Sequence, residues 1–131
     1  MSKVSVKFSV LAEALAVCRL EAGAEVPGWA MRGPFFSVTR TAEELSIVCS
    51  AAEVPQSIKS EVGWKALKLE GPFDFGLVGI LASITEPLAQ AGISLFALST
   101  FDTDYVLVKE IHLSQALAVL QDYGHQLVEN D

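Results

Sequence analysis

Cysteine, histidine and basic residues are scarce in this sequence, and each shortage narrows the possible functions. The 131 residues include two cysteines, two histidines, and nine lysines or arginines against sixteen acidic residues. The net charge of -7 opposes a sequence-independent attraction to nucleic acid phosphates or anionic lipids. Cys18 and Cys49 lie in separate apolar runs, and His112 and His125 lack the spacing that zinc requires. We expect buried free thiols, surface or capping histidines, no metal and no cofactor.

Long apolar runs are also absent. The longest stretch, residues 76–84, is too short to cross a bilayer and is followed directly by Thr85, Glu86 and Pro87. The N-terminus alternates lysines with apolar residues, which predicts a strand rather than a secretory signal. We therefore expect a cytoplasmic protein whose partner is a small molecule or another protein.

Motifs that carry catalysis are missing as well. The sequence contains no glycine-rich phosphate loop, no nucleophile elbow and no cluster of histidine, cysteine and carboxylate residues. It also lacks a basic loop for phosphate, and residues 105–108 lack the interleaved aromatic and basic residues of RNA-binding strands. We expect that the protein is not an enzyme.

The second half of the chain, residues 63–131, follows the order strand, helix, strand, strand, helix, strand. Alternation of apolar and polar residues predicts its strands, at residues 64–69, 93–98, 105–108 and 125–128. This order predicts an α+β fold in which two helices cover one face of a four-stranded antiparallel sheet, the ferredoxin-like βαββαβ arrangement.

Two helices fill the remaining parts of this half. Apolar residues recur at three- and four-residue intervals from Leu77 to Leu88, which places them on one helical stripe. A second helix opens at Ser114, and Gly124 is suited to end it. Pro87 removes a backbone donor, so we expect a kink or an early end of the first helix there.

The first half, residues 1–62, is poor in helix signals. Two alternating runs at 36–40 and 45–49 flank the polar residues 41–44, which predicts a hairpin. Residues 24–31 have room for at most about one helical turn. We expect a shortened unit that shares a continuous core with the second half and does not fold alone.

Several segments resemble the ACT-domain group, in particular small bacterial proteins with tandem ACT-like halves related to the regulatory part of aspartate kinase. They are Leu-Glu-Gly-Pro-Phe-Asp-Phe-Gly at 69–76, Gly-Ile-Ser-Leu-Phe at 92–96, and Ser-Thr-Phe-Asp-Thr-Asp-Tyr-Val-Leu-Val at 99–108. The Ser-Thr-Phe-x-Thr-Asp run is the most specific, and cytosolic arginine sensors of animal cells share it. Residues 35–49 resemble the shorter first half. The resemblance implies tandem ACT-like units that bind an amino acid and regulate a partner.

Two loops are the candidate ligand site. Free amides at the helix start near Gly76, Leu77 and Val78 would hold a carboxylate, because the helix dipole is positive there. The resemblance places Thr100, Phe101 and Asp104 beside the bound amino acid, with Asp104 accepting hydrogen bonds from a cationic group. Without the resemblance, loops of this composition are more often ordinary turns than binding sites.

The sequence therefore predicts a sensor that binds a small molecule, an amino acid above all, and passes its presence to a partner protein. The alternative is a protein-interaction or assembly module with no small ligand. The high apolar content of a short chain further predicts a homodimer, in which a second copy covers part of the surface.

Overall fold

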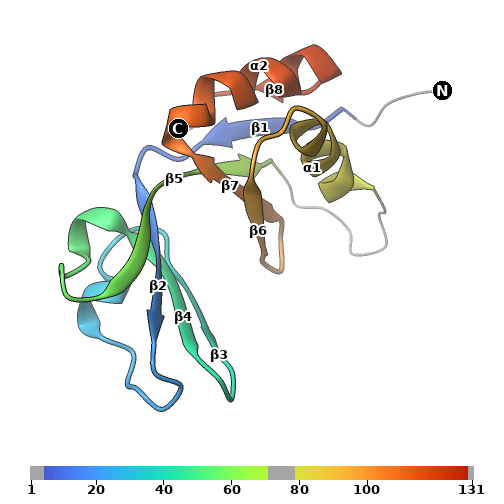
Figure 1. Cartoon of the computed structure of the whole chain (residues 1–131). Coiled ribbons are helices and arrows are strands. Elements are labelled where there is room, and N and C mark those ends of the chain that lie inside the picture. The colour runs from blue at the N-terminus through green and yellow to red at the C-terminus, as the bar shows by residue number, and fades with distance from the viewer. Residues whose placement is uncertain (1–4, 71–78, 130–131) are drawn as a thin grey trace. The chain divides into compact units, whose positions relative to one another are not determined.

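The structure is a computed structural model that describes residues 5–70 and 79–129, and the chain forms two compact units. The inserted unit consists of Glu13–Trp64. The outer unit combines the described residues before Glu13 with those after Trp64. Strand β5 (Lys59–Leu69) supplies residues to both units (Figure 1). Residues 5–12 thus belong to the unit formed mainly by the second half of the chain.

The inserted unit follows the ferredoxin-like order with each helix reduced to a single 3₁₀ turn. Its elements are β2 (Leu15–Leu20), η1 (Gly28–Met31), β3 (Ser37–Arg40), β4 (Leu45–Ser50), η2 (Ala51–Glu53) and the first part of β5. The strands lie in the order β3-β4-β2-β5, which is the order of a complete βαββαβ unit. The inserted unit thus has the strand order of a ferredoxin-like unit with shortened helices, while the division of the chain at residues 62 and 63 stays a prediction.

The core of the inserted unit is small and contains both cysteines. Its fully buried members are Ala16, Cys18, Ala30, Leu45, Ile47 and Cys49. Cys18 lies on β2 and Cys49 on β4, and a hydrogen bond joins the two thiols. Burial raises the pKa of Cys49 to about 12, with smaller contributions from Cys18 and Glu53. Burial also raises the pKa of Cys18, which the hydrogen bond from Cys49 partly offsets.

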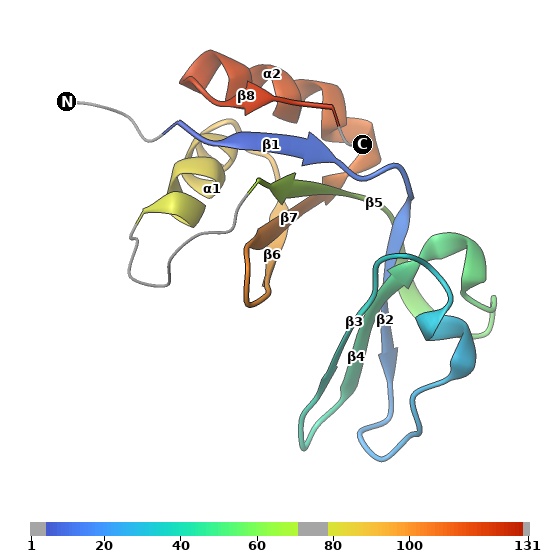
Figure 2. The same cartoon turned by 180° about the vertical axis from the view of Figure 1, so that it is seen from behind.

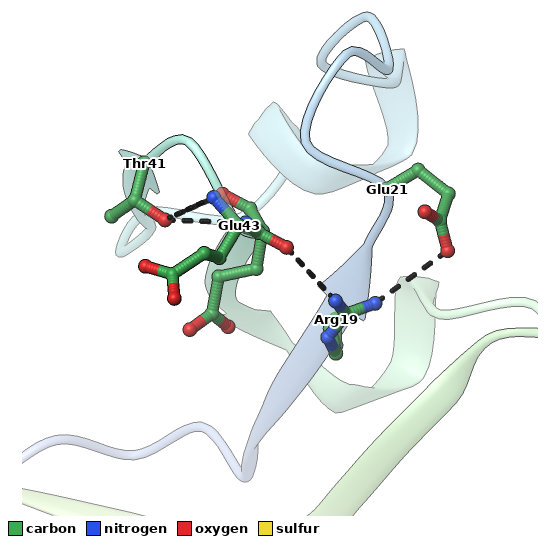
Figure 3. Close-up of polar contacts among 5 residues, drawn as sticks. Arg19, Glu21, Thr41 and Glu43 are labelled. Carbon is green, nitrogen blue, oxygen red and sulfur yellow. Dashed lines mark hydrogen bonds and ion pairs between the residues drawn. The ribbon is translucent and has the colours of Figure 1, made fainter.

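The turn of the β3–β4 hairpin is held by polar contacts at its tip (Figure 3). Thr41 Oγ1 accepts hydrogen bonds from the backbone N–H groups of Glu43 at 3.1 Å and Glu44 at 3.2 Å. Arg19 donates from Nη2 to the Glu43 carbonyl at 2.9 Å, and its Nη1 lies 3.6 Å from Glu21 Oε1. These groups are exposed, so they define the hairpin geometry more than they stabilise the fold.

The outer unit has the predicted order strand, helix, strand, strand, helix, strand, with one further strand. After β5 its elements are α1 (Ile80–Gln90), β6 (Leu95–Ser99), β7 (Asp104–Lys109), η3 (Glu110–His112), α2 (Leu113–Tyr123) and β8 (Gln126–Leu127). Strand β1 (Lys7–Val10) pairs antiparallel with β5 and parallel with β8. The sheet order is therefore β8-β1-β5-β7-β6, with five strands where the sequence predicts four.

Both helices of the outer unit cover the same face of its sheet (Figures 1 and 2). The strands and helices share one apolar cluster, whose fully buried large side chains include Phe8, Leu67, Leu69, Ile84, Leu88, Val106, Val108 and Leu120. This cluster is separate from the core of the inserted unit. The expectation of one continuous core is therefore wrong for the described residues.

Helix α1 continues through Pro87 because another residue replaces the missing backbone donor. Proline has no N–H to donate to the carbonyl four residues earlier, which belongs to Ser83. His125 Nε2 lies 2.7 Å from that Ser83 oxygen, and the Val6 N–H donates to His125 Nδ1 at 3.1 Å. Because Nδ1 accepts, Nε2 carries the proton and donates to Ser83.

His125 is consequently a buried structural residue, only 4% exposed, so the expectation of a surface role is wrong for it, while its backbone N–H does help to cap α2. Its position follows from the end of α2, where Gly124 has a φ of 116°. Hydrogen bonds from Gly124 N–H to the Gln121 carbonyl and from His125 N–H to the Leu120 carbonyl form a Schellman motif. This motif turns the chain so that the imidazole points toward α1.

Candidate functional site

The turn between β6 and β7 is the best-defined part of the candidate site. Thr100 N–H donates to the Thr103 carbonyl at 2.8 Å, and Thr103 N–H donates to Thr100 Oγ1 at 3.3 Å. Thr103 is buried, and its Oγ1 donates to the Leu69 carbonyl at 2.6 Å. This bond fixes the turn against the end of β5, the strand that leads into residues 71–78.

Asp104 lies at the start of β7 and directly opposite Ser99 of β6. Ser99 Oγ donates a short hydrogen bond to Asp104 Oδ1. Side chains alternate along a strand, so Asp104 shares the face of Val106 and Val108, which pack in the core beneath the helices. Because a carboxylate has about four acceptor sites, this hydrogen bond leaves Asp104 with capacity for a cationic group of a ligand.

Phe101 and Asp102 occupy the exposed tip of the turn. Phe101 is 81% exposed, so its ring lies outside the apolar core of the outer unit. The structure thus brings Thr100 and Asp104 into one hydrogen-bonded turn and places Phe101 at the outer end of that turn.

Gly76, Leu77 and Val78 lie outside the described residues, so their part of the predicted site stays a prediction. The residues on either side of this segment form hydrogen bonds within the outer unit. Glu70 N–H donates to the Lys7 carbonyl at 2.9 Å, and the Glu70 carboxylate accepts from Ser9 Oγ at 2.9 Å. Gly79 precedes α1 with a φ of 83°, and its carbonyl accepts from Ser83 N–H at 2.9 Å.

Sequence reasoning did not select Ser99 or Thr103, although both hold the turn in place. Ser99 orients the Asp104 carboxylate, and Thr103 attaches the turn to β5. The signal for Ser99 was available, because a short hairpin places it opposite Asp104. Thr103 had no such signal, since its partner Leu69 lies on a strand distant in sequence.

An open hollow of about 510 Å³ lies elsewhere on the outer unit, lined by Val10, Ala12, Leu127, Val128 and Glu129. It contains none of the predicted site residues. Within residues 5–70 and 79–129, no three histidine, cysteine or acidic side chains gather as metal ligands. Neither α1 nor α2 has the length and apolar character of a bilayer-spanning helix.

Comparison with known sequences gives two adjacent family matches. The model of the ACT domain matches residues 59–122, and a model described as an N-terminal domain matches residues 13–57. The chain is 31% identical over 107 residues to the cytosolic arginine sensor for mTORC1 subunit 1 of Rattus norvegicus. That match covers 75% of this chain and 32% of the rat protein. The chain therefore corresponds to about a third of this relative.

Comparison with solved structures extends the similarity to whole chains. A crystal structure of a protein from Agrobacterium tumefaciens has a TM-score of 0.92 and 38% identity, covering 98% of this chain and 96% of that one. The regulatory subunit of aspartate kinase from Thermus thermophilus has a TM-score of 0.59 and 12% identity, covering 93% and 99%. At that identity the Thermus subunit shows the fold alone. With its βαββαβ topology and the ACT-domain match over residues 59–122, the chain is an ACT-like protein.

Proposed function

We propose that this protein binds an amino acid at the β6–β7 turn and passes the presence of the ligand to a partner protein. The observation that carries the proposal is the arrangement of Asp104. Its carboxylate is oriented by Ser99, on a turn that Thr103 attaches to the end of β5. A carboxylate held in this way is prepared to accept charge-assisted hydrogen bonds from an amino or guanidinium group.

The proposed ligand lies between this turn and the segment that precedes α1. Backbone amides of Gly76, Leu77 and Val78 bind its carboxylate, Asp104 binds its cationic end, and Thr100 and Phe101 lie beside it. Backbone N–H groups suit a carboxylate, and this segment leads into α1, which begins at Ile80 and whose positive dipole end favours an anion. The name of the rat relative, a cytosolic arginine sensor, supports an amino acid as the ligand class.

The proposal also covers the location, the assembly and the role of the protein. The two ACT-like units belong to a cytoplasmic homodimer that regulates rather than catalyses. The name of the rat relative, a cytosolic sensor, supports the cytoplasmic and regulatory parts of this proposal.

A second candidate function is a protein-interaction module without a small ligand. The exposure of Phe101, at 81%, and of Ile111, at 85%, favours it, because large apolar side chains that are this exposed often contact partners. A thermal-shift screen of the twenty amino acids separates the two functions. Only a true ligand stabilises the folded state by mass action, so a screen without any shift supports the interaction module.

The replacement Asp104→Asn tests the site directly. Losing a charge-assisted hydrogen bond costs about 1.5 to 3 kcal/mol, so the dissociation constant of the best amino acid should rise roughly ten- to a hundredfold. Isothermal titration calorimetry on both proteins measures this change. The melting temperature without ligand should change little, because Asp104 is only partly buried at the end of a strand.

Asp102→Asn is the matched control, since it makes the same chemical change in the same turn at an exposed position. Its affinity should stay close to that of the parent protein. If the parent and Asp104→Asn bound the amino acid with equal affinity, Asp104 would not belong to the site. This would hold even if the screen had identified a ligand.

A further inference from the structure

The turn between β3 and β4 in the inserted unit repeats the turn between β6 and β7 in the outer unit. Thr41 N–H donates to the Glu44 carbonyl at 2.9 Å, and Thr100 N–H donates to the Thr103 carbonyl at 2.8 Å. Each threonine Oγ1 also accepts from the N–H group three residues later, at 3.2 Å in the inserted unit and 3.3 Å in the outer unit. Figure 3 shows the turn at Thr41. The two hairpins can therefore be compared position by position.

The position before the turn differs between the two units. In the inserted unit it is Arg40, which lies opposite Leu45. In the outer unit it is Ser99, which lies opposite Asp104. Both pairs lie on the core face of their sheet, because Leu45 belongs to the core of the inserted unit and Asp104 lies two residues before the buried Val106. Where the inserted unit has an arginine and a leucine, the outer unit has a serine and a carboxylate.

Arg40 joins its hairpin to the loop that follows β2. Its guanidinium donates to the Ala22 carbonyl and, at 2.7 Å, to the Ala24 carbonyl. This loop leads from β2 to η1, so in chain order it corresponds to the segment between β5 and α1 of the outer unit. The proposed function puts a ligand between that segment and the β6–β7 turn. In the inserted unit, the Arg40 side chain spans the two corresponding parts.

The charge around Arg40 suits a cation. Residues 21–25 and 41–44 together include four glutamates, and Arg19 lies 3.6 Å from one of them, Glu21. Even with Arg19 and Arg40 counted, these segments keep a net negative charge, which attracts cations. A planar guanidinium with five N–H donors can also serve two carbonyls at once. The loop and the turn therefore offer a guanidinium group both acceptors and a favourable potential.

We propose that Arg40 is a built-in substitute for the cationic end of a ligand, so that the inserted unit is a self-occupied copy of the site in the outer unit. The inference rests on the proposed function and deepens it. The outer unit supplies the Asp104 carboxylate and takes its cation from a free amino acid, whereas the inserted unit supplies the cation itself. Each chain therefore binds one amino acid, in its outer unit.

Moving the arginine to the outer unit tests this correspondence. Ser99→Arg places the same side chain at the equivalent position, opposite the Asp104 carboxylate. Opposite charges directly across a ladder stabilise a sheet, so the melting temperature without ligand should rise. A tethered cation also competes with the ligand at a high effective concentration, so the dissociation constant of the best amino acid should rise at least about tenfold. Ser99→Gln is the uncharged control and should not raise the melting temperature.

Chemical rescue tests the inserted unit without any amino acid. Arg40→Ala removes the guanidinium, so the melting temperature should fall. Ethylguanidinium at millimolar concentration should then raise the melting temperature of this variant relative to its effect on the parent, because it binds where the side chain was. Arg19→Ala is the matched control, since Arg19 donates to a single carbonyl, that of Glu43, at the same hairpin. Ethylguanidinium should shift this control as it shifts the parent.

The outcomes separate this inference from the proposed function. Equal effects of ethylguanidinium on Arg40→Ala and Arg19→Ala would overturn the self-occupied site, as would two amino acids bound per parent chain in calorimetry. A Ser99→Arg variant with the melting temperature and affinity of the parent would overturn the correspondence between the two units. A parent that binds no amino acid would overturn the proposed function, while rescue of Arg40→Ala would still establish a guanidinium site in the inserted unit.

Discussion

At the scale of single residues, the two cysteines show how the surroundings created by the fold change the chemistry of a side chain. Taken from the sequence, each is an isolated thiol in an apolar run. Antiparallel pairing of β2 with β4 brings them into hydrogen-bonding contact inside the small core of the inserted unit. In that core a thiolate is poorly solvated, and burial raises the pKa of Cys49 to about 12.

This raised pKa predicts a loss of stability at alkaline pH. In the unfolded chain a cysteine ionises near pH 8.5, whereas folded Cys49 keeps its proton to about pH 12. Its contribution is therefore fully present below about pH 8.5 and is lost as pH rises toward 12. Between pH 8 and pH 10 this one group should lower the free energy of unfolding by about 2 kcal/mol.

Urea unfolding of the parent and of Cys49→Ala at both pH values measures the effect. The alanine variant starts from a lower stability because it leaves a cavity, but it should lose less between pH 8 and pH 10. If the two proteins lost the same free energy over this interval, ionisation of Cys49 would play no part in the alkaline transition.

At the scale of elements, α1 depends on a residue from outside the helix. Pro87 leaves the Ser83 carbonyl without its intrahelical donor, and His125 supplies the replacement. The same imidazole accepts from Val6 just before β1, so it joins a helix to the sheet. The helix therefore tolerates a proline in its last turns only in this tertiary context.

A double-mutant cycle tests this account of α1. His125→Ala leaves the buried Val6 N–H and the partly buried Ser83 carbonyl unpaired, so it should cost roughly 2 to 4 kcal/mol of unfolding free energy. In a Pro87→Ala background, position 87 has an N–H for Ser83, and the cost of His125→Ala should fall by about 1 to 3 kcal/mol. Chemical denaturation of the four proteins gives the coupling energy. Additive costs would show that the histidine does not substitute for the missing helix donor.

At the scale of the whole molecule, the sequence of one unit is inserted into the sequence of the other. Strand β1 precedes the inserted unit, yet it pairs with the end of β5 and with β8, which follow it. A cut near the middle of the sequence therefore separates β1 from both neighbours. It also removes Trp64, the residue opposite Leu15 in the sheet of the inserted unit.

We predict that residues 1–62, expressed alone, have no cooperative unfolding transition. Their own core is the small apolar cluster of the inserted unit, and a domain of this size is only marginally stable even when its core and sheet are complete. Circular dichroism during urea titration checks this, with the full chain as the control that unfolds cooperatively. A sigmoidal transition for the fragment would show instead that the first half is an independent domain.

The sequence alone determined the features that depend on neighbouring residues. Alternation and helical spacing predicted both helices of the outer unit, the hairpin around Thr41, and the end of α2 at Gly124. The run at 99–104 also pointed to the turn that holds Asp104. These signals are readable because strand and helix periods repeat within a few residues.

Tertiary structure decided what depends on partners distant in sequence. Pairing of Phe8 with Leu69 placed β1 in the sheet of the outer unit. Pairing of two strands brought Cys18 next to Cys49. The Schellman motif at the end of α2 directed His125 toward Ser83. It also attached the candidate turn to β5 through Thr103 and Leu69. Such contacts leave no periodic signal, because the hydrogen bond or buried area that stabilises them exists only once both segments have been brought together.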